Sequence, residues 1–161
     1  MKFLSTSEKQ TYNFAKKFSK KLTGGEVLGL VGNLGAGKTI FTKGLAAGLG
    51  IKKSITSPTF VLMRLYPVKS SRLAGRILPK AKLFNRVYPI AKHQTIRLLV
   101  HIDAYRVKSA NDLIAIGADE YFSRPDAITV IEWADKIKKI LPRKTKFITI
   151  TYKNNSRIIK F

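Results

Sequence analysis

The residues with the clearest chemical meaning lie at 32–39, where the sequence reads GNLGAGKT and fits the pattern G-x-x-x-x-G-K-S/T at every position. Its glycines allow the chain to curl so that successive backbone N–H groups point at one bound anion. Lys38 adds a point charge suited to the β- and γ-phosphates of a nucleotide, and is expected to act in catalysis, while the Thr39 hydroxyl is a ligand that Mg²⁺ accepts. The pattern predicts a nucleotide-binding loop made of Gly32, Asn33, Leu34, Gly35, Ala36, Gly37, Lys38, Thr39 and Ile40.

A loop of this kind hydrolyses its nucleotide only with a carboxylate near Mg²⁺ and a group that orients the attacking water. No acidic residue lies between Glu26 and Asp103, which narrows the choice. Asp103 and Glu132 are the acids placed directly at the ends of apolar runs. One is expected to hold Mg²⁺, directly or through water, and the other to position or deprotonate the nucleophile. Spacing alone leaves the division of roles open.

A hydroxyl-rich loop, TSPTF at 56–60, follows the predicted nucleotide-binding loop and its helix. Such a loop is able to respond to the γ-phosphate as a switch, with Thr56 or Thr59 reaching the metal region. The sequence by itself favours a simpler interpretation, in which these residues form an ordinary turn that contains Pro58. The candidate switch-like residues are Thr56, Ser57, Pro58 and Thr59.

The elements around these residues must bring them together. Three short apolar runs, at 27–31, 98–103 and 127–132, have the composition of strands buried on both faces, and they end at the glycine loop and at the two acids. A helix is expected from about 37 to 49. Strands alternating with helices predict an α/β fold, a P-loop NTPase-like three-layer sandwich with a mainly parallel central sheet. Ligands in such sheets bind beyond the carboxyl ends of strands, so the loop and both acids are expected at one edge.

The remaining elements carry weaker signals. The spacing of Ser5 and Glu8 fits a capping box, which predicts a helix that begins there and ends near 23–25. We also expect a strand at 61–66, helices at 109–116, 119–122 and 134–140, and two closing strands at 147–152 and 157–161 joined by a turn.

Composition bounds the class of protein. A chain of 161 residues is expected to form a single P-loop ATPase domain over residues 1–161. It has no cysteine, which excludes disulfide scaffolds and thiolate metal sites and fits a reducing compartment. No stretch approaches the roughly 18 apolar residues that a membrane span needs. We therefore expect a cytoplasmic protein without a membrane partner.

Charge is the unusual property of this chain. It has 31 Lys and Arg against nine Asp and Glu, a formal net charge of +22. Such a surface attracts polyanions such as RNA, although a general bias toward lysine would give the same composition. Part of the charge lies in a basic excursion at about 67–95, which contains no acid.

Four motifs in this order resemble the TsaE (YjeE) family, bacterial ATPases that support threonylcarbamoyladenosine modification of tRNA. They are GNLGAGKT at 32–39, TSPTF at 56–60, HIDAYR at 101–106 and VIEW at 130–133. The first motif is common to a superfamily, and the combination with the other three is much narrower. The resemblance covers about 26–135 apart from the excursion, which is longer than expected for this family.

The resemblance implies a division of labour that spacing left open. Residues 32–39 would bind ATP, Thr39 and Glu132 would hold Mg²⁺, and Asp103 would be the base or the acid that orients water. Residues 56–60 would form the switch-like loop of the family. The family acts with a TsaB–TsaD heterodimer, which transfers the threonylcarbamoyl group to adenosine of tRNA, so hydrolysis here would drive or reset that cycle. The basic surface makes tRNA a further candidate partner. By the same resemblance, the basic excursion could reach tRNA, contact the partner proteins, or form a solvated loop.

Two other functions are compatible with these residues. A P-loop small-molecule kinase could use the basic excursion as a lid over the phosphates, although no acceptor pocket is evident in the sequence. A nucleic-acid-binding module could bind nucleotide without turnover, in which case Asp103 and Glu132 would be dispensable.

Overall fold

A computed structural model describes residues 1–58, 61–68 and 96–161. Most of the predicted basic excursion, and Thr59 of the predicted switch-like loop, lie outside the described residues. In the described part, one mixed sheet has the strand order β1-β7-β6-β2-β5-β4-β3. Its strands are β1 (Lys2–Ser5), β2 (Val27–Val31), β3 (Met63–Pro67), β4 (Leu98–Asp103), β5 (Ala127–Glu132), β6 (Lys146–Lys153) and β7 (Ser156–Lys160).

The sheet is parallel at its centre and antiparallel at its edges. β2 pairs in parallel with both β5 and β6, and β5 pairs in parallel with β4. The antiparallel pairs are β3 with β4, β7 with β6, and β1 with β7. The three apolar runs form β2, β4 and β5 at the predicted bounds, which confirms the parallel centre. Their carboxyl ends therefore meet at one edge of the sheet.

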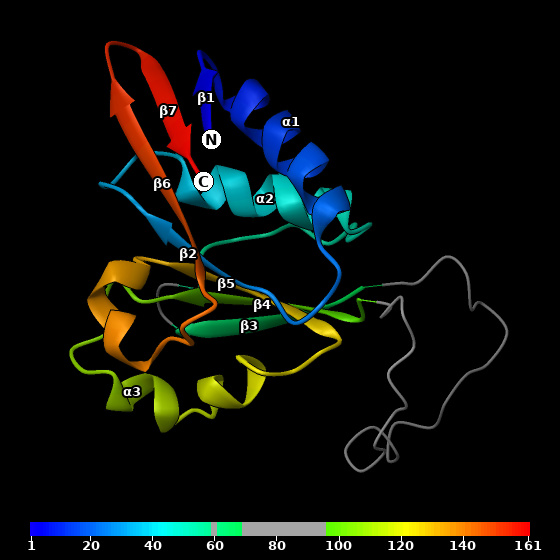
Figure 1. Ribbon diagram of the computed structural model, residues 1–161, viewed down its shortest axis with the longest axis vertical. Coiled ribbons are helices and arrows are strands. Elements are labelled where there is room, and N and C mark those ends of the chain that lie inside the picture. The colour runs from blue at the N-terminus through cyan, green and yellow to red at the C-terminus, as the bar shows by residue number, and fades with distance from the viewer. Residues whose placement is uncertain (59–60, 69–95) are drawn as a thin grey trace, which may run out of the picture.

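Helices cover both faces of the sheet and give the predicted three layers (Figure 1). The helices are α1 (Glu8–Phe18), α2 (Lys38–Gly48) and α3 (Asn111–Ile114), with the 3₁₀ helices η1 (Ser19–Lys21), η3 (Ala118–Tyr121) and η4 (Ala134–Ile140). Side chains alternate along each central strand, so that Val130 of β5 packs in the core under α1 and α2, and Ile131 packs in the core under α3 and η4.

Helices α1 and α2 approach each other closely because glycine lies at their contact. A Cβ atom on Gly44 would come 2.3 Å from the carbonyl oxygen of Tyr12, and one on Gly48 would come 1.9 Å from the Ser19 hydroxyl. Both distances are far below contact distance, so no larger residue fits without moving α1. This packing fixes α2, and with it the loop that precedes α2.

The beginning of the chain differs from the prediction. Ser5 belongs to β1, which pairs with β7, so the predicted capping box from Ser5 to Glu8 is wrong. The helix is capped by Ser7, whose side chain accepts a hydrogen bond from the backbone N–H of Gln10 at 3.2 Å. Residues 2–5 form a strand because they pair with β7, near the other end of the sequence, and no local sequence pattern indicates that pairing.

The elements after β4 follow the prediction with shorter helices. The helix expected at 109–116 is limited to α3, since Gly117, at φ 69°, turns the chain before η3. The segment at 134–140 is helical at the predicted bounds, but as a 3₁₀ helix with non-helical dihedrals at Ile137. The expected edge and closing strands appear as β3, β6 and β7, with ends shifted by one or two residues. No helix in the described part has the length and apolarity of a membrane span.

Candidate nucleotide-binding site

The glycine-rich loop connects the end of β2 to the start of α2. Gly35 and Gly37 adopt φ values of 75° and 105°, in the left-handed region that favours glycine. At Gly32 a Cβ atom would lie 2.2 Å from the carbonyl oxygen of Ile150 on β6, so no side chain fits there. Because α2 begins at Lys38, its unpaired N–H groups and the positive end of its dipole face the loop. The conformation suits an anion such as a nucleotide phosphate.

Lys38 is buried beside the loop. Its Nζ donates hydrogen bonds to the carbonyl oxygens of Gly32 at 2.7 Å and Asn33 at 2.9 Å. The same nitrogen lies 3.7 Å from the centroid of the Trp133 ring, a cation–π contact. Burial lowers the pKa of the Lys38 amino group below its usual range, and the nearby carboxylates, with Glu132 first, partly offset that effect. The amino group is thus held over the loop by weak acceptors, and a phosphate would be a stronger partner.

Asp103 and Glu132 lie side by side at the ends of β4 and β5, where they are register partners. Each side chain is almost fully buried, with 3% of each residue exposed. Oε2 of Glu132 accepts a hydrogen bond from the Thr39 hydroxyl at 2.9 Å, so this carboxylate reaches the loop. Its other oxygen, Oε1, lies 2.8 Å from Nε2 of His101.

The Asp103 carboxylate has different neighbours. Oδ1 accepts a hydrogen bond from the backbone N–H of Tyr105 at 2.9 Å, and Oδ2 accepts one from the Ser57 hydroxyl. Ser57 therefore connects the predicted switch-like loop to the predicted catalytic acid. The neighbouring Thr56 accepts a hydrogen bond from Arg64 at 2.9 Å instead, and Pro58 is buried. The structure thus brings Ser57, rather than Thr56, to the acid.

The oxygen atoms of Thr39 and Glu132 fit Mg²⁺ as protein ligands. Mg²⁺ prefers hard oxygen donors and usually takes one or two protein ligands together with substrate phosphates and water. Within the described part of the chain, no three His, Cys, Asp or Glu side chains gather into a metal site of their own. A divalent ion here would therefore depend on the phosphates for much of its coordination.

Besides Trp133, two further residues near the site were not among the predicted site residues. His101 is fully buried against Glu132, and the alternation along β4, with His101 two residues before Asp103, is the signal that places it on the same face. Arg157 on β7 donates from Nε to the Ala36 carbonyl oxygen of the loop at 3.2 Å. The sequence offers one clue, since Arg157 shares the inward alternation of Ile159 and Phe161.

Comparison with known proteins gives one consistent result. The family model described as "Threonylcarbamoyl adenosine biosynthesis protein TsaE" matches residues 5–75 and 84–159. The chain is 35% identical to "tRNA threonylcarbamoyladenosine biosynthesis protein TsaE" of Treponema pallidum, over 93% of this chain and 90% of that protein. It is 33% identical to the protein of the same name from Bacillus subtilis, over 93% and 77%.

A solved structure agrees with the sequence comparisons. The crystal structure of Bacillus subtilis YdiB superimposes with a TM-score of 0.68 at 29% identity, covering 99% of this chain and 82% of that one. Together with the sheet order and the loop between β2 and α2, this likeness confirms the predicted P-loop NTPase-like fold.

Proposed function

Because this chain belongs to the TsaE family of threonylcarbamoyl adenosine biosynthesis proteins, we propose that it binds and hydrolyses ATP in threonylcarbamoyladenosine modification of tRNA. The observation that carries the proposal is the meeting of three features at one sheet edge. These are the phosphate-shaped loop, a Thr39–Glu132 pair at 2.9 Å, and a second buried acid, Asp103, in register with Glu132. We further propose that the protein acts as one domain in the cytoplasm and associates with a TsaB–TsaD pair.

Phosphate binding is assigned to the loop and Lys38. The loop N–H groups and the start of α2 provide donors to the phosphate oxygens. Lys38 Nζ exchanges its two backbone carbonyl partners for the β- and γ-phosphates. Since the lysine is buried, its charge is weakly screened and its contact with phosphate is correspondingly strong.

Thr39 and Glu132 are assigned to Mg²⁺. The bound ion would neutralise charge on the phosphate oxygens during transfer. Glu132 presents Oε2 toward Thr39, while His101 occupies Oε1 and limits rotation of the carboxylate. This leaves Asp103 as the group that orients the attacking water and accepts its proton.

Asp103 suits that task because its carboxylate is held from two sides. The backbone N–H of Tyr105 and the hydroxyl of Ser57 both donate to it, and it is buried next to the loop. A carboxylate in a fixed orientation positions a water at lower entropic cost than a mobile one. Movement of residues 56–58 would alter the Ser57 contact and so couple the loop to the acid.

The test is ATP hydrolysis by the purified protein, alone and with a TsaB–TsaD pair from the same organism plus tRNA. Hydrolysis is expected to rise with the pair and to fall by at least about 100-fold in Asp103→Asn, the loss typical of removing a general base. ATP affinity should remain close to wild type in this variant. Ser57→Ala is the matched control, with a smaller loss, because it removes one orienting hydroxyl and keeps the carboxylate. Unchanged hydrolysis in Asp103→Asn would refute the assigned role, and no stimulation by the pair would refute the partnership.

A further inference from the structure

A hollow lies at the end of the parallel strands remote from the nucleotide-binding loop. Its volume is about 390 Å³, and its lining includes Phe18, Leu22, Ile148 and Phe161 with Lys21 and Lys146. Lys146 opens β6 beside Leu28 near the start of β2, whereas the nucleotide-binding loop follows the end of β2. The two sites therefore lie at opposite ends of the parallel strands.

The hollow has aromatic walls of fixed orientation. The rings of Phe18 and Phe161 meet edge to face with centroids 5.8 Å apart, and both contact Phe14 in the core. Leu22 and Ile148 are buried parts of the same core. A volume near 390 Å³ falls within the range of about 300–1,000 Å³ typical of ligand sites. The hollow offers a preformed apolar surface to one flat ring system.

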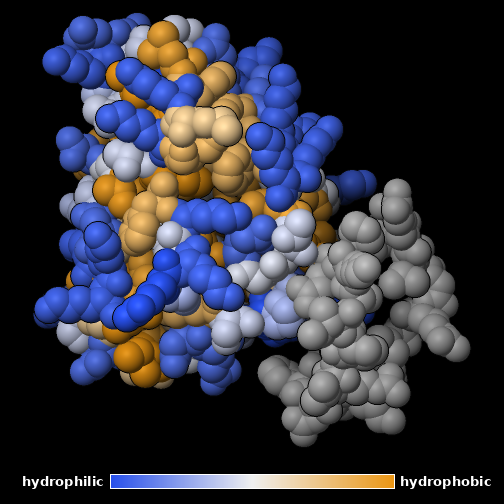
Figure 2. All heavy atoms as spheres, in the orientation of Figure 1, coloured by the Kyte–Doolittle hydropathy of each residue, from blue (hydrophilic) through white to orange (hydrophobic). Residues whose placement is uncertain are grey.

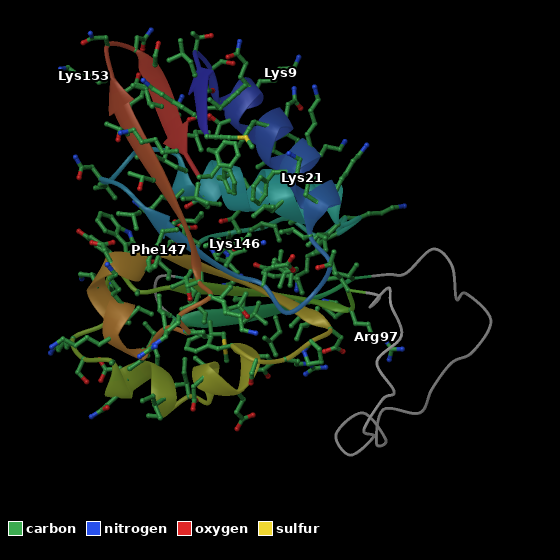
Figure 3. All side chains as sticks on the ribbon, viewed as in Figure 1. Lys9, Lys21, Arg97, Lys146, Phe147 and Lys153 are labelled. Atoms are coloured by element: carbon green, nitrogen blue, oxygen red, sulfur yellow. The ribbon has the colours of Figure 1, made fainter. Side chains whose placement is uncertain are left out.

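Cations border this apolar surface from two segments of the chain. Lys21 ends η1 and Lys146 begins β6, and Figure 3 shows both near the middle of this face. Exposed basic residues continue along each segment, namely Lys16, Lys17 and Lys20 on one side and Arg143 and Lys144 on the other. Figure 2 shows apolar side chains gathered among hydrophilic ones on the same face.

One acid, Glu26, lies near this border. Its Oε1 is 3.8 Å from Lys146 Nζ. Glu26 also accepts hydrogen bonds from the backbone N–H groups of Thr23 and Gly24, so its charge is shared among several donors. The Lys146 side chain remains 57% exposed. The rim therefore keeps a positive potential toward solvent.

We propose that this hollow binds an unstacked nucleotide of an RNA strand, with the base against Phe18 and Phe161 and the flanking phosphates on Lys21 and Lys146. Each nucleotide in a strand has a phosphate on both sides, and this arrangement matches the lysines on both sides of the apolar surface. Aromatic side chains stack on bases without requiring a particular sequence. An excess of 22 positive charges over the whole chain adds long-range attraction. This inference does not depend on ATP hydrolysis.

The first experiment measures binding of a fluorescein-labelled, ten-nucleotide single-stranded RNA by anisotropy at several salt concentrations. The double variant Lys21→Gln with Lys146→Gln is expected to lower the slope of log K against log salt by about 1.4, since each phosphate contact on a single strand contributes about 0.7. At 150 mM salt this corresponds to a loss of about tenfold. The matched control removes the same charge from the opposite layer by Lys108→Gln with Lys139→Gln, both exposed. An equal loss in the control would overturn the site in favour of general attraction.

A second variant tests the aromatic surface on which the base would stack. Phe18→Leu keeps an apolar side chain and removes the ring, so binding should weaken by about fivefold or more if a base stacks there. Its thermal midpoint, measured in parallel, shows that the variant is folded. Unchanged RNA affinity in a folded variant would overturn the proposal, as would displacement of the RNA by a glutamate-rich peptide at equal concentration. Nucleotide affinity in the same preparations reports separately on the ATP site.

Discussion

The Glu132 carboxylate joins two neighbours, because one oxygen lies 2.9 Å from the Thr39 hydroxyl and the other 2.8 Å from His101 Nε2. His101 is fully buried, and its Nδ1 has no hydrogen-bond partner among the described residues. In the proposed role of Glu132 as a Mg²⁺ ligand, its carboxylate would be ionised, and Nε2 would then be the donor of the pair. The imidazole therefore acts as a positioning group that keeps Oε2 directed toward Thr39.

Replacing His101 with leucine is expected to weaken Mg²⁺-dependent ATP binding by about tenfold, the lower limit for loss of a group that orients a metal ligand. ATP binding in EDTA should change little, because the loop N–H groups and Lys38 do not need the imidazole. His101→Gln can place an N–H near the position of Nε2 and is expected to retain most of the Mg²⁺ effect. Calorimetric titration with and without Mg²⁺ gives both affinities. A leucine variant with the wild-type Mg²⁺ effect would contradict the positioning role.

At the scale of single residues, the sequence allowed the meeting of Asp103 and Glu132 to be predicted, because both end apolar strands whose carboxyl ends share an edge. Their separate neighbours could not be predicted, since spacing along a chain does not give the direction of a side chain. In the structure Glu132 points to Thr39, and Asp103 accepts from Ser57 and Tyr105. The inward alternation of β7 places Arg157 in the interior, but nothing in the sequence indicates that its partner is Ala36, 121 positions away.

Strand β7 supports the nucleotide-binding loop from the side. Arg157 is buried and donates to the Ala36 carbonyl oxygen at 3.2 Å, while a Cβ on Gly37 would lie 3.0 Å from the same guanidinium nitrogen. The guanidinium also lies 4.8 Å from the Tyr152 ring and 3.5 Å from Glu8 of α1. The hairpin of β6 and β7 and the start of α1 thus meet the loop through one side chain.

Replacing Arg157 with leucine is expected to destabilise the fold by about 1–3 kcal/mol, because the Ala36 carbonyl oxygen loses a buried donor. The thermal midpoint should fall by roughly 2–4 °C per kcal/mol. ATP affinity should fall about fivefold, corresponding to about 1 kcal/mol, because the loop loses a support. Differential scanning calorimetry and ATP titration measure the two effects.

A matched control separates the loop contact from the outer ion pair. Glu8→Gln removes the exposed partner of Arg157 and leaves the Ala36 contact in place, so both the midpoint and ATP affinity should stay near wild type. If Arg157→Leu lowers stability while ATP affinity is unchanged, Arg157 supports the sheet and has no effect on the loop.

At the scale of elements, continuous apolar runs predicted β2, β4 and β5 at their observed bounds, because a strand buried on both faces has little freedom in where it can end. Elements whose structure depends on distant partners were predicted less well. The spacing predicts a helix cap at Ser5, but Ser5 lies in β1. Residues 134–140 form a 3₁₀ helix, and the spacing of apolar residues does not distinguish a 3₁₀ helix from an α-helix. Residues 134–140 pack closely against β2, since a Cβ atom on Gly29 would lie 2.9 Å from the Ala134 Cβ.

The large net positive charge of the whole molecule destabilises its compact folded state. A net charge of +22 on 161 residues produces repulsion between surface lysines that folding brings closer together. Five acids, Asp112, Asp119, Glu120, Asp126 and Asp135, lie in the layer of α3, η3 and η4 or at its margins, whereas the exposed part of α1 and η1 carries mainly lysine. The α1 side therefore has the stronger positive potential.

Raising NaCl from 20 to 300 mM is expected to increase the thermal midpoint by about 2–5 °C, because salt shortens the screening length and weakens this repulsion. KCl at equal ionic strength is the control and should act equally if screening is the cause. A midpoint that falls with salt, measured by calorimetry, would mean that ion pairs such as Arg124–Asp126 outweigh the repulsion.

The contact between Lys38 and Trp133 has an optical consequence. Trp133 is the single tryptophan of the chain, and the Lys38 ammonium lies 3.7 Å from the centre of its ring. A cation at that distance perturbs the excited state of an indole. If Lys38 moves from the ring to a phosphate, as proposed above, tryptophan emission would report on that displacement. The molecule thus carries its own spectroscopic probe, and rapid mixing can follow the arrival of a nucleotide without any attached dye.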